Sequence, residues 1–198
     1  MMTIGTLPGE RLAGLSADLF HKLQAGAISI DELALFNRRK NPFTPEVVEE
    51  RLLERIGTAN LAGITSFTVA KKFVVDETVD GIKVGWLGDN FKKHFLPKVE
   101  KGEVTAETLA INNLSKNAKD PAIITNLGGE PKVEISLGQF WEFLKTADRS
   151  FWYVAYVRDD QRVLWAVNAD WPGDKLHVEA FSLDSPDGWR RGNRFLSR

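Results

Sequence analysis

The stretch Gly85–His94 concentrates side chains that can do chemistry: a carboxylate, an amide, two ammonium groups and an imidazole. It lies where a strand is expected to turn into a helix, and backbone amides at such a terminus can bind an anion. Asp89 and His94 are the candidate acid and base of this stretch, with Lys93 beside them. If folding brought these side chains together, the protein would be a small hydrolase or transferase.

A structural role explains the same residues more simply. Asp89 and His94 are five positions apart, whereas side chains that meet on a helix face are three or four apart. Asp89 suits the first turn of a helix, and Lys93 and His94 suit its last turn, where the helix dipole favours cations. We therefore expect no catalytic residue here, and Trp86, Asn90 and Lys93 remain candidate binding residues.

Other patterns that carry chemistry are missing from the sequence. It has no Gly-x-Ser-x-Gly elbow and no Walker-type phosphate loop, and its three histidines do not have the spacing of a metal site. The absence of cysteine excludes disulfides, thiolate metal sites and a cysteine nucleophile. The paired carboxylates Asp76-Glu77 and Asp159-Asp160 fall at predicted turns, where they are expected to be solvated. We expect neither a metal nor a cofactor.

Basic clusters offer a second alternative, nucleic-acid or ribosome binding. If they shared one face, they could hold phosphates while Trp189 or Phe195 stacked on a base. The chain as a whole carries a net charge of −1, and residues 158–187 hold seven acids and three bases that can offset the basic tail. An internal charge match therefore accounts for the clusters without a polyanion. They comprise Arg38-Arg39-Lys40, Lys71-Lys72, Lys92-Lys93, and Arg190-Arg191 with Arg194 and Arg198.

Tryptophan is concentrated late in the chain. All six tryptophans lie at or after Trp86, and four of them, beginning with Trp152, fall in the final quarter. Tryptophan and arginine are both enriched at binding hot spots, which makes Trp189, Arg190, Arg191 and Arg194 candidate binding residues. Because catalytic patterns are missing, the expected function is that of a soluble, non-catalytic binding or interaction protein whose partner is another protein.

The composition is that of an ordinary globular protein. The 198 residues are 43% hydrophobic and 27% charged, which suffices for a sizeable core. No segment approaches the roughly 20 apolar residues that span a bilayer, and the first residues lack the basic start and apolar run of a signal peptide. We therefore expect a cytoplasmic protein without membrane contact.

The first third of the chain is expected to form three helices. Leucines between Leu12 and Leu23 recur at helical spacing, and Gly26 suits a C-terminal cap. Ser29–Glu32 has the spacing of a capping box that opens a second helix. Thr44-Pro45 suits the start of a third helix, which is expected to end at Gly57. These helices define an expected helical region over residues 1–64.

The remainder, residues 65–198, is expected to form an α+β domain, possibly continuous with the helical region. Its main feature is a largely antiparallel sheet flanked by short helices. Lys98–Glu103 is expected to be a charged loop. The expected elements are a hairpin around Asp80-Gly81, a helix from Leu87 or Gly88 to Phe95, a brief strand near Leu109–Ile111, helices opening at Asp120-Pro121 and at the capping box Ser136–Gln139, and a tryptophan-rich meander over Phe151–Val157, Val163–Val167 and Leu176–Ala180 with an edge strand at Arg194–Ser197.

Three parts of the sequence resemble a known group of proteins. They are the run Gly85–Leu96, the opening Thr6–Glu10 with Leu15–Phe20, and the expected strand Leu164–Val167. These parts are similar to an uncharacterised family of hypothetical proteins encoded by uncultured bacteria with small genomes, and the similarity spans most of the chain. The resemblance implies a bacterial protein of unknown function, and it implies no activity, cofactor or catalytic residue.

Overall fold

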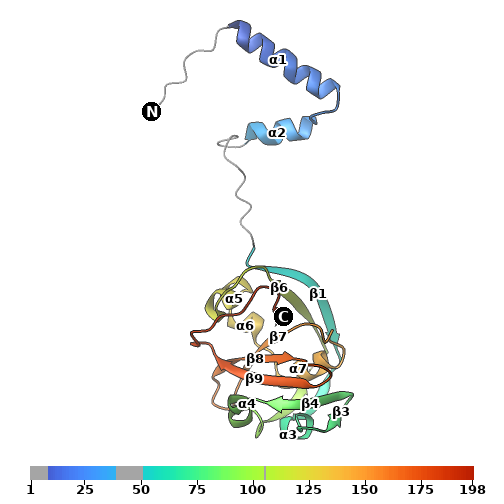
Figure 1. Cartoon of the computed structure of the whole chain (residues 1–198), viewed down its shortest axis with the longest axis vertical. Helices are drawn as coiled ribbons and strands as arrows, with labels where there is room; N and C mark the ends of the chain where they lie inside the picture. Colours follow the sequence, from blue (N-terminus) through green and yellow to red (C-terminus); the bar gives the residue numbers. More distant parts are fainter. Residues whose placement is uncertain (1–8, 39–50, 105) are drawn as a thin grey trace. The chain divides into compact units, whose positions relative to one another are not determined.

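Figure 1 shows the computed structural model, which describes residues 9–38, 51–104 and 106–198. The chain divides into two compact units, residues 1–49 and 50–198. The division therefore falls earlier than the boundary at residue 64 that the sequence suggested. The reason is that residues assigned to the helical region belong to the sheet of the second unit.

The first unit contains two helices, α1 (Gly9–Gln24) and α2 (Ile30–Arg38). After α1 the chain turns at Gly26, whose φ of 68° suits a residue without a side chain. The capping box of α2 is confirmed, because Glu32 N donates to Ser29 Oγ at 3.1 Å and Ser29 N donates to Glu32 Oε2 at 2.8 Å. The two helices expected here from leucine spacing and capping are therefore present.

The third helix predicted from Thr44 to Gly57 is wrong over its described part. Leu53–Leu61 forms strand β1, which pairs antiparallel with β6 (Glu107–Leu114) along its length. Leu53 and Leu61 are buried at the two ends of β1, so pairing and burial override the helical spacing of the apolar residues. Thr44-Pro45, the expected start of that helix, lies outside the described residues.

The second unit is built on a mixed sheet of eight strands in the order β1-β6-β10-β7-β8-β9-β4-β3. The meander β7-β8-β9 is antiparallel as expected, but β10 runs parallel to β7 and β4 runs parallel to β9. The expectation of a largely antiparallel sheet is therefore corrected to a mixed one within an α+β fold. The remaining strands of the sheet are β3 (Thr78–Val79), β4 (Ile82–Leu87), β7 (Tyr153–Arg158), β8 (Leu164–Asp170), β9 (Leu176–Ser182) and β10 (Arg194–Ser197).

Strand β10 lies inside the sheet, although the sequence suggested an edge strand. It pairs with β6 on one side and with β7 on the other. Its central residues, Phe195 and Leu196, are both fully buried and belong to different core clusters on opposite faces. Consecutive side chains of a strand point to opposite faces, and the two core clusters cover both faces of β10.

Short elements cover or extend the sheet. Strands β2 (Ile64–Thr68) and β5 (Val99–Val104) form a separate antiparallel pair, so the charged loop expected at residues 98–103 is largely a strand. The hairpin at Asp80-Gly81 is confirmed, with φ of 51° and 80° at the two turn residues. The helices of this unit are α3 (Val69–Lys72), α4 (Asp89–His94), α5 (Asp120–Asn126), α6 (Glu130–Val133) and α7 (Leu137–Leu144).

The core divides into two clusters because β7 is covered on both faces. Tyr153 and Ala155 point into the larger cluster, which contains Trp141 of α7. Val154 and Tyr156 point into a smaller cluster with Trp189. This smaller cluster is the one against which the candidate site is built. No helix in the described ranges has both the length and the apolar character that a membrane crossing requires.

Candidate functional site

The structure does not bring the candidate pair Asp89 and His94 together. The Asp89 side chain is fully exposed, with its Oδ1 3.4 Å from the Nζ of Lys92. His94 instead faces the β7-β8 turn, where its Nδ1 lies 3.3 Å from Asp159 Oδ2. Asp89 opens α4 and His94 ends it, as the structural interpretation predicted. Lys93 is exposed on the same helix.

The partner of His94 corrects a second expectation, because Asp159 is buried rather than solvated. Its Oδ1 accepts hydrogen bonds from the amides of Gln161 and Val163, and its Oδ2 accepts one from Trp165 Nε1 at 3.0 Å. Burial raises the pKa of the Asp159 carboxyl, but these hydrogen bonds outweigh burial and leave the pKa below its usual range. Asp159 therefore organises the β7-β8 turn and anchors α4 through His94. Among the described contacts, no nucleophilic side chain accompanies the pair of His94 and Asp159.

The remaining candidate binding residues separate into different places. Trp86 is 42% exposed and packs at a tilt on His177, while the Asn90 side chain donates to Ala180 O at 3.0 Å. The Arg194 guanidinium stacks 3.2 Å from the ring centroid of Phe151, and Arg194 does not line the pocket formed around Trp189. Only Trp189, Arg190 and Arg191 meet at one site.

Several of the basic clusters are matched by acids. Lys72 lies 2.6 Å from Asp80, and Lys92 pairs with Asp89. Arg38 belongs to the first unit, whereas the other clusters that the structure describes belong to the second. Lys72 and Lys92 are therefore individually paired with acids. The ion pairs of the described residues join none of Arg190, Arg191 and Arg194 to an acid of residues 158–187, and Arg198 pairs with Glu107, so the expected offset between that segment and the basic tail stays a prediction.

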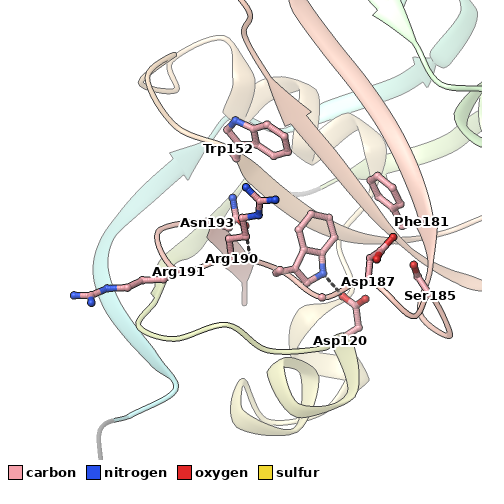
Figure 2. A pocket seen from close by; sticks show the side chains of 10 residues that line it. Asp120, Trp152, Phe181, Ser185, Asp187, Arg190, Arg191 and Asn193 are labelled. Carbon is pink, nitrogen blue, oxygen red and sulfur yellow. Dashed lines mark hydrogen bonds between the residues drawn. The ribbon is translucent and has the colours of Figure 1, made fainter.

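Trp189, Arg190 and Arg191 line a pocket with a volume of about 470 Å³, which lies within the size range of natural ligand sites (Figure 2). Most of the surface that lines the pocket is apolar, and polar groups of several lining residues stand around that apolar surface. Figure 2 shows Arg191 pointing away from Trp152 and Phe181. The other residues that line the pocket are Asp120, Trp152, Phe181, Ser185, Asp187, Gly188 and Asn193.

The segment between β9 and β10 forms much of this pocket, and a backbone bridge fixes it. Trp189 N donates to Ala118 O at 2.8 Å, and Ala118 N donates to Trp189 O at 3.1 Å. Gly188 permits this close approach, because a Cβ at Gly188 would lie 2.9 Å from Ala118 O. Arg191 N also donates to Asn117 Oδ1. The pocket residues of this segment are therefore held against the chain before α5.

Asp120 is the buried polar centre of the site. Tyr156 Oη and Trp189 Nε1 both donate to Asp120 Oδ1, each at 2.7 Å. Burial raises the pKa of the Asp120 carboxyl, and the two hydrogen bonds only partly oppose that effect. Burial and the nearby Asp120 carboxylate likewise raise the pKa of Tyr156. The carboxyl thus fixes the Trp189 ring in one orientation.

The aromatic walls are packed rather than loose. Trp189 meets Phe181 edge to face with ring centroids 5.6 Å apart, and it meets Phe195 in the same way at 5.8 Å. Trp152 stands at the other side of the opening and is 50% exposed. An apolar or planar group can enter between these rings, where arginine, amide and hydroxyl groups of the lining can orient it.

The lining does not form a catalytic arrangement. Ser185 supplies a hydroxyl, but no histidine or lysine is among the described residues that line the pocket to activate it. Asp120 already accepts two hydrogen bonds through one oxygen and holds the fold together. The geometry therefore suits binding better than acid–base or nucleophilic chemistry.

Sequence reasoning missed Asp120, Trp152 and Phe181 as parts of this site. Asp120-Pro121 signalled a helix start, which is correct, because Asp120 is the first residue of α5. The burial of its carboxyl depends on Tyr156 and Trp189, which are 36 and 69 positions away. No local pattern carries that information.

No family model, curated protein or solved structure matches this chain.

Proposed function

We propose that this chain is a non-catalytic binding protein whose second unit receives an apolar side chain of a protein or peptide partner, in the cytoplasm. The observation that carries the proposal is the aromatic pocket of about 470 Å³ in which Trp189 is fixed by Asp120. A wall with a fixed orientation loses little side-chain entropy when a ligand binds, so contact with it favours binding.

The size and chemistry of the pocket support an apolar anchor. Burying a leucine or phenylalanine side chain contributes about 1.5 to 3 kcal/mol, which is enough for one side chain to dominate a modest interface. The exposed face of Trp152 adds area for such a group. Arg190, Asn193 and Asp187 provide polar groups around the apolar surface, which is the arrangement of a protein interface.

The two alternative functions have weaker support. The hydrolase or transferase required Asp89 beside His94, but Asp89 is exposed and His94 contacts Asp159. The nucleic-acid alternative required unmatched basic groups, but Lys72 is paired with an acid. Neither alternative has a described site comparable to the pocket.

The proposal is tested by titrating the protein with the amide of N-acetyl-phenylalanine and with phenylalanine-containing peptides, using calorimetry or fluorescence. The Trp152→Ala variant removes an exposed wall and is expected to weaken binding at least about fivefold, corresponding to about 1 kcal/mol. Trp86→Ala is the matched control, because Trp86 is similarly exposed and does not line the pocket. Equal affinities for wild type and Trp152→Ala, or no binding of any probe, would contradict the proposal.

A further inference from the structure

The guanidinium group of Arg190 has no partner among the described residues, although Arg190 lines the pocket. The side chain is exposed, and none of the ion pairs of the described residues includes it. The cation–π contacts in the described part of the chain are both made by Arg194. The N–H donors of the Arg190 guanidinium are therefore accessible to a ligand in the pocket.

The backbone that carries this guanidinium is held in place. Arg190 N donates to Asn193 Oδ1 at 2.8 Å, and Asn193 N donates to Arg190 O at 3.1 Å. The residue before it, Trp189, forms the two backbone hydrogen bonds with Ala118. Only the rotamers of the Arg190 side chain remain to be ordered when a ligand binds, which keeps the entropic cost of that contact low.

Figure 2 distinguishes the two neighbouring arginines of the pocket lining. The Arg190 side chain extends in the direction of Trp152, whereas Arg191 points away from it. Trp152 is half-exposed at the opening, and the Trp189 ring forms the fixed wall. Arg190 is therefore the arginine whose charge lies at the opening through which an apolar group enters.

The acids that line the pocket lie elsewhere in it. Figure 2 shows Asp187 beside Phe181, on the other side of the Trp189 ring from Arg190. Asp120 is buried and accepts two hydrogen bonds through its Oδ1. Because neither acid forms an ion pair with Arg190 in the described part of the chain, the positive charge at the opening is available to attract an anion.

We infer that Arg190 binds a carboxylate in the same partner segment whose apolar side chain enters the pocket. This inference rests on the proposed function, because the pocket holds the segment in place. The planar guanidinium can donate two parallel hydrogen bonds to the two oxygens of a carboxylate, a geometry that an ammonium group cannot match. The carboxylate is either the C-terminus of the partner or an aspartate or glutamate side chain next to the apolar anchor.

Two pairs of probes distinguish these sources of a carboxylate. N-acetyl-phenylalanine and its amide share the apolar side chain and differ only at the terminal group, which has a pKa of about 3.5 in the free acid and is ionised at neutral pH. In the second pair, N-acetyl-phenylalanyl-aspartic acid amide is compared with the asparagine peptide of the same length. The first pair tests a C-terminal carboxylate, and the second tests an acidic side chain.

The test measures the affinity of the full chain for the four probes at pH 7 and low salt. In at least one pair the carboxylate probe should bind about fivefold more tightly than its neutral counterpart, a difference of about 1 kcal/mol. This is the upper end of what exposed ion pairs contribute, and a two-pronged contact from a fixed backbone accounts for it. High salt should reduce the preference.

Two variants show whether the preference depends on Arg190 itself. In Arg190→Gln the ratio of the two affinities should fall close to one, and a ratio measured on one variant cancels any general loss of binding. Lys119→Gln is the matched control, because Lys119 is exposed, precedes Asp120 and does not line the pocket. It removes the same charge near the site and should keep the preference. Circular dichroism checks that both variants are folded.

The outcomes separate this inference from the proposed function. Equal binding within both pairs, or a carboxylate preference that survives in Arg190→Gln, would overturn the role of Arg190 and leave the pocket standing. An equal loss of the preference in Lys119→Gln would overturn it too, because the effect would then be one of overall charge. Binding of no probe would overturn both proposals. A preference that is lost in Arg190→Gln alone would support both.

Discussion

Trp189 Nε1 donates a hydrogen bond of 2.7 Å to the buried Oδ1 of Asp120, so the first residue of α5 orients the aromatic wall of the pocket. Tyr156 donates to the same oxygen from strand β7. One carboxyl thus joins a helix start, a central strand and the segment before β10. Stability and binding should both depend on this junction.

Replacement of Asp120 separates the loss of the acceptor from the loss of the charge. Asp120→Ala leaves the Tyr156 hydroxyl and the Trp189 N–H buried without an acceptor, which should lower the free energy of unfolding by about 2 to 5 kcal/mol. Asp120→Asn keeps an oxygen acceptor and should lose much less. Urea unfolding followed by tryptophan fluorescence measures both variants. Equal losses for the two would show that the hydrogen bonds do not account for the stability.

The raised pKa of Asp120 gives the pH dependence of stability a definite sign. The folded state holds the Asp120 proton more tightly than the unfolded state does. In the unfolded state the carboxyl has its ordinary pKa of 3.8. The contribution of Asp120 is therefore fully present below pH 3.8 and is lost as pH rises through the raised folded pKa. Relative to Asp120→Asn, the wild type should become less stable as pH increases over that window. Unfolding measured for both proteins between about pH 3 and 7 tests this, and the opposite slope would contradict it.

The sequence predicted local features better than the site. Three predicted features rest on neighbouring residues or on simple periodicity, and all three are present. They are the capping box of Ser29 and Glu32, the turn at Asp80-Gly81, and the meander of β7 to β9. The strand Leu53–Leu61 was taken for part of a helix because leucine and isoleucine at helical spacing fit either state. Its pairing with β6, about 50 positions away, decides the outcome.

The candidate site was predicted only in part for the same reason. Trp189, Arg190 and Arg191 were chosen by residue type, and they do line the pocket. The pairing of Asp89 with His94 relied on sequence proximity, whereas His94 meets Asp159 from a turn 65 positions later. Spatial partners so distant in sequence leave no local signal, so the chemistry of a pocket cannot be predicted from spacing alone.

A side chain at Gly188 should destabilise the fold. A Cβ there would lie 2.9 Å from the backbone oxygen of Ala118, and backbone cannot move aside as a flexible side chain can. Gly188→Ala should lower the free energy of unfolding by about 1 to 3 kcal/mol and weaken ligand binding at the pocket. Gly57→Ala is the control, because an added Cβ meets nothing within 4 Å. Thermal unfolding of both variants provides the comparison, and an unaffected Gly188→Ala would show that the bridge to Ala118 does not constrain the segment.

Asp159 and Asp89 should differ sharply in their effect on stability. Asp159→Ala removes the acceptor of Trp165 and of two backbone amides, so we expect a loss of about 2 to 4 kcal/mol. Asp89→Ala changes a fully exposed side chain and should cost much less than Asp159→Ala. Because the pKa of Asp159 is lowered, its stabilising contribution should be present at neutral pH and lost as pH falls through the folded pKa. Chemical denaturation at pH 7 compares the two variants, and a larger loss for Asp89→Ala would be inconsistent with the structure.

The most direct test of the binding pocket is a two-dimensional NMR titration of the indole N–H signals with the amide of N-acetyl-phenylalanine. The chain has six tryptophans, so each indole reports on a separate location once assigned by substitution. The account predicts that the signals of Trp152 and Trp189 shift together at the same ligand concentrations, while those of Trp86 and the buried Trp141 stay in place. Shifts confined to Trp86, or no shift at Trp152 and Trp189 up to the solubility limit of the probe, would contradict the account.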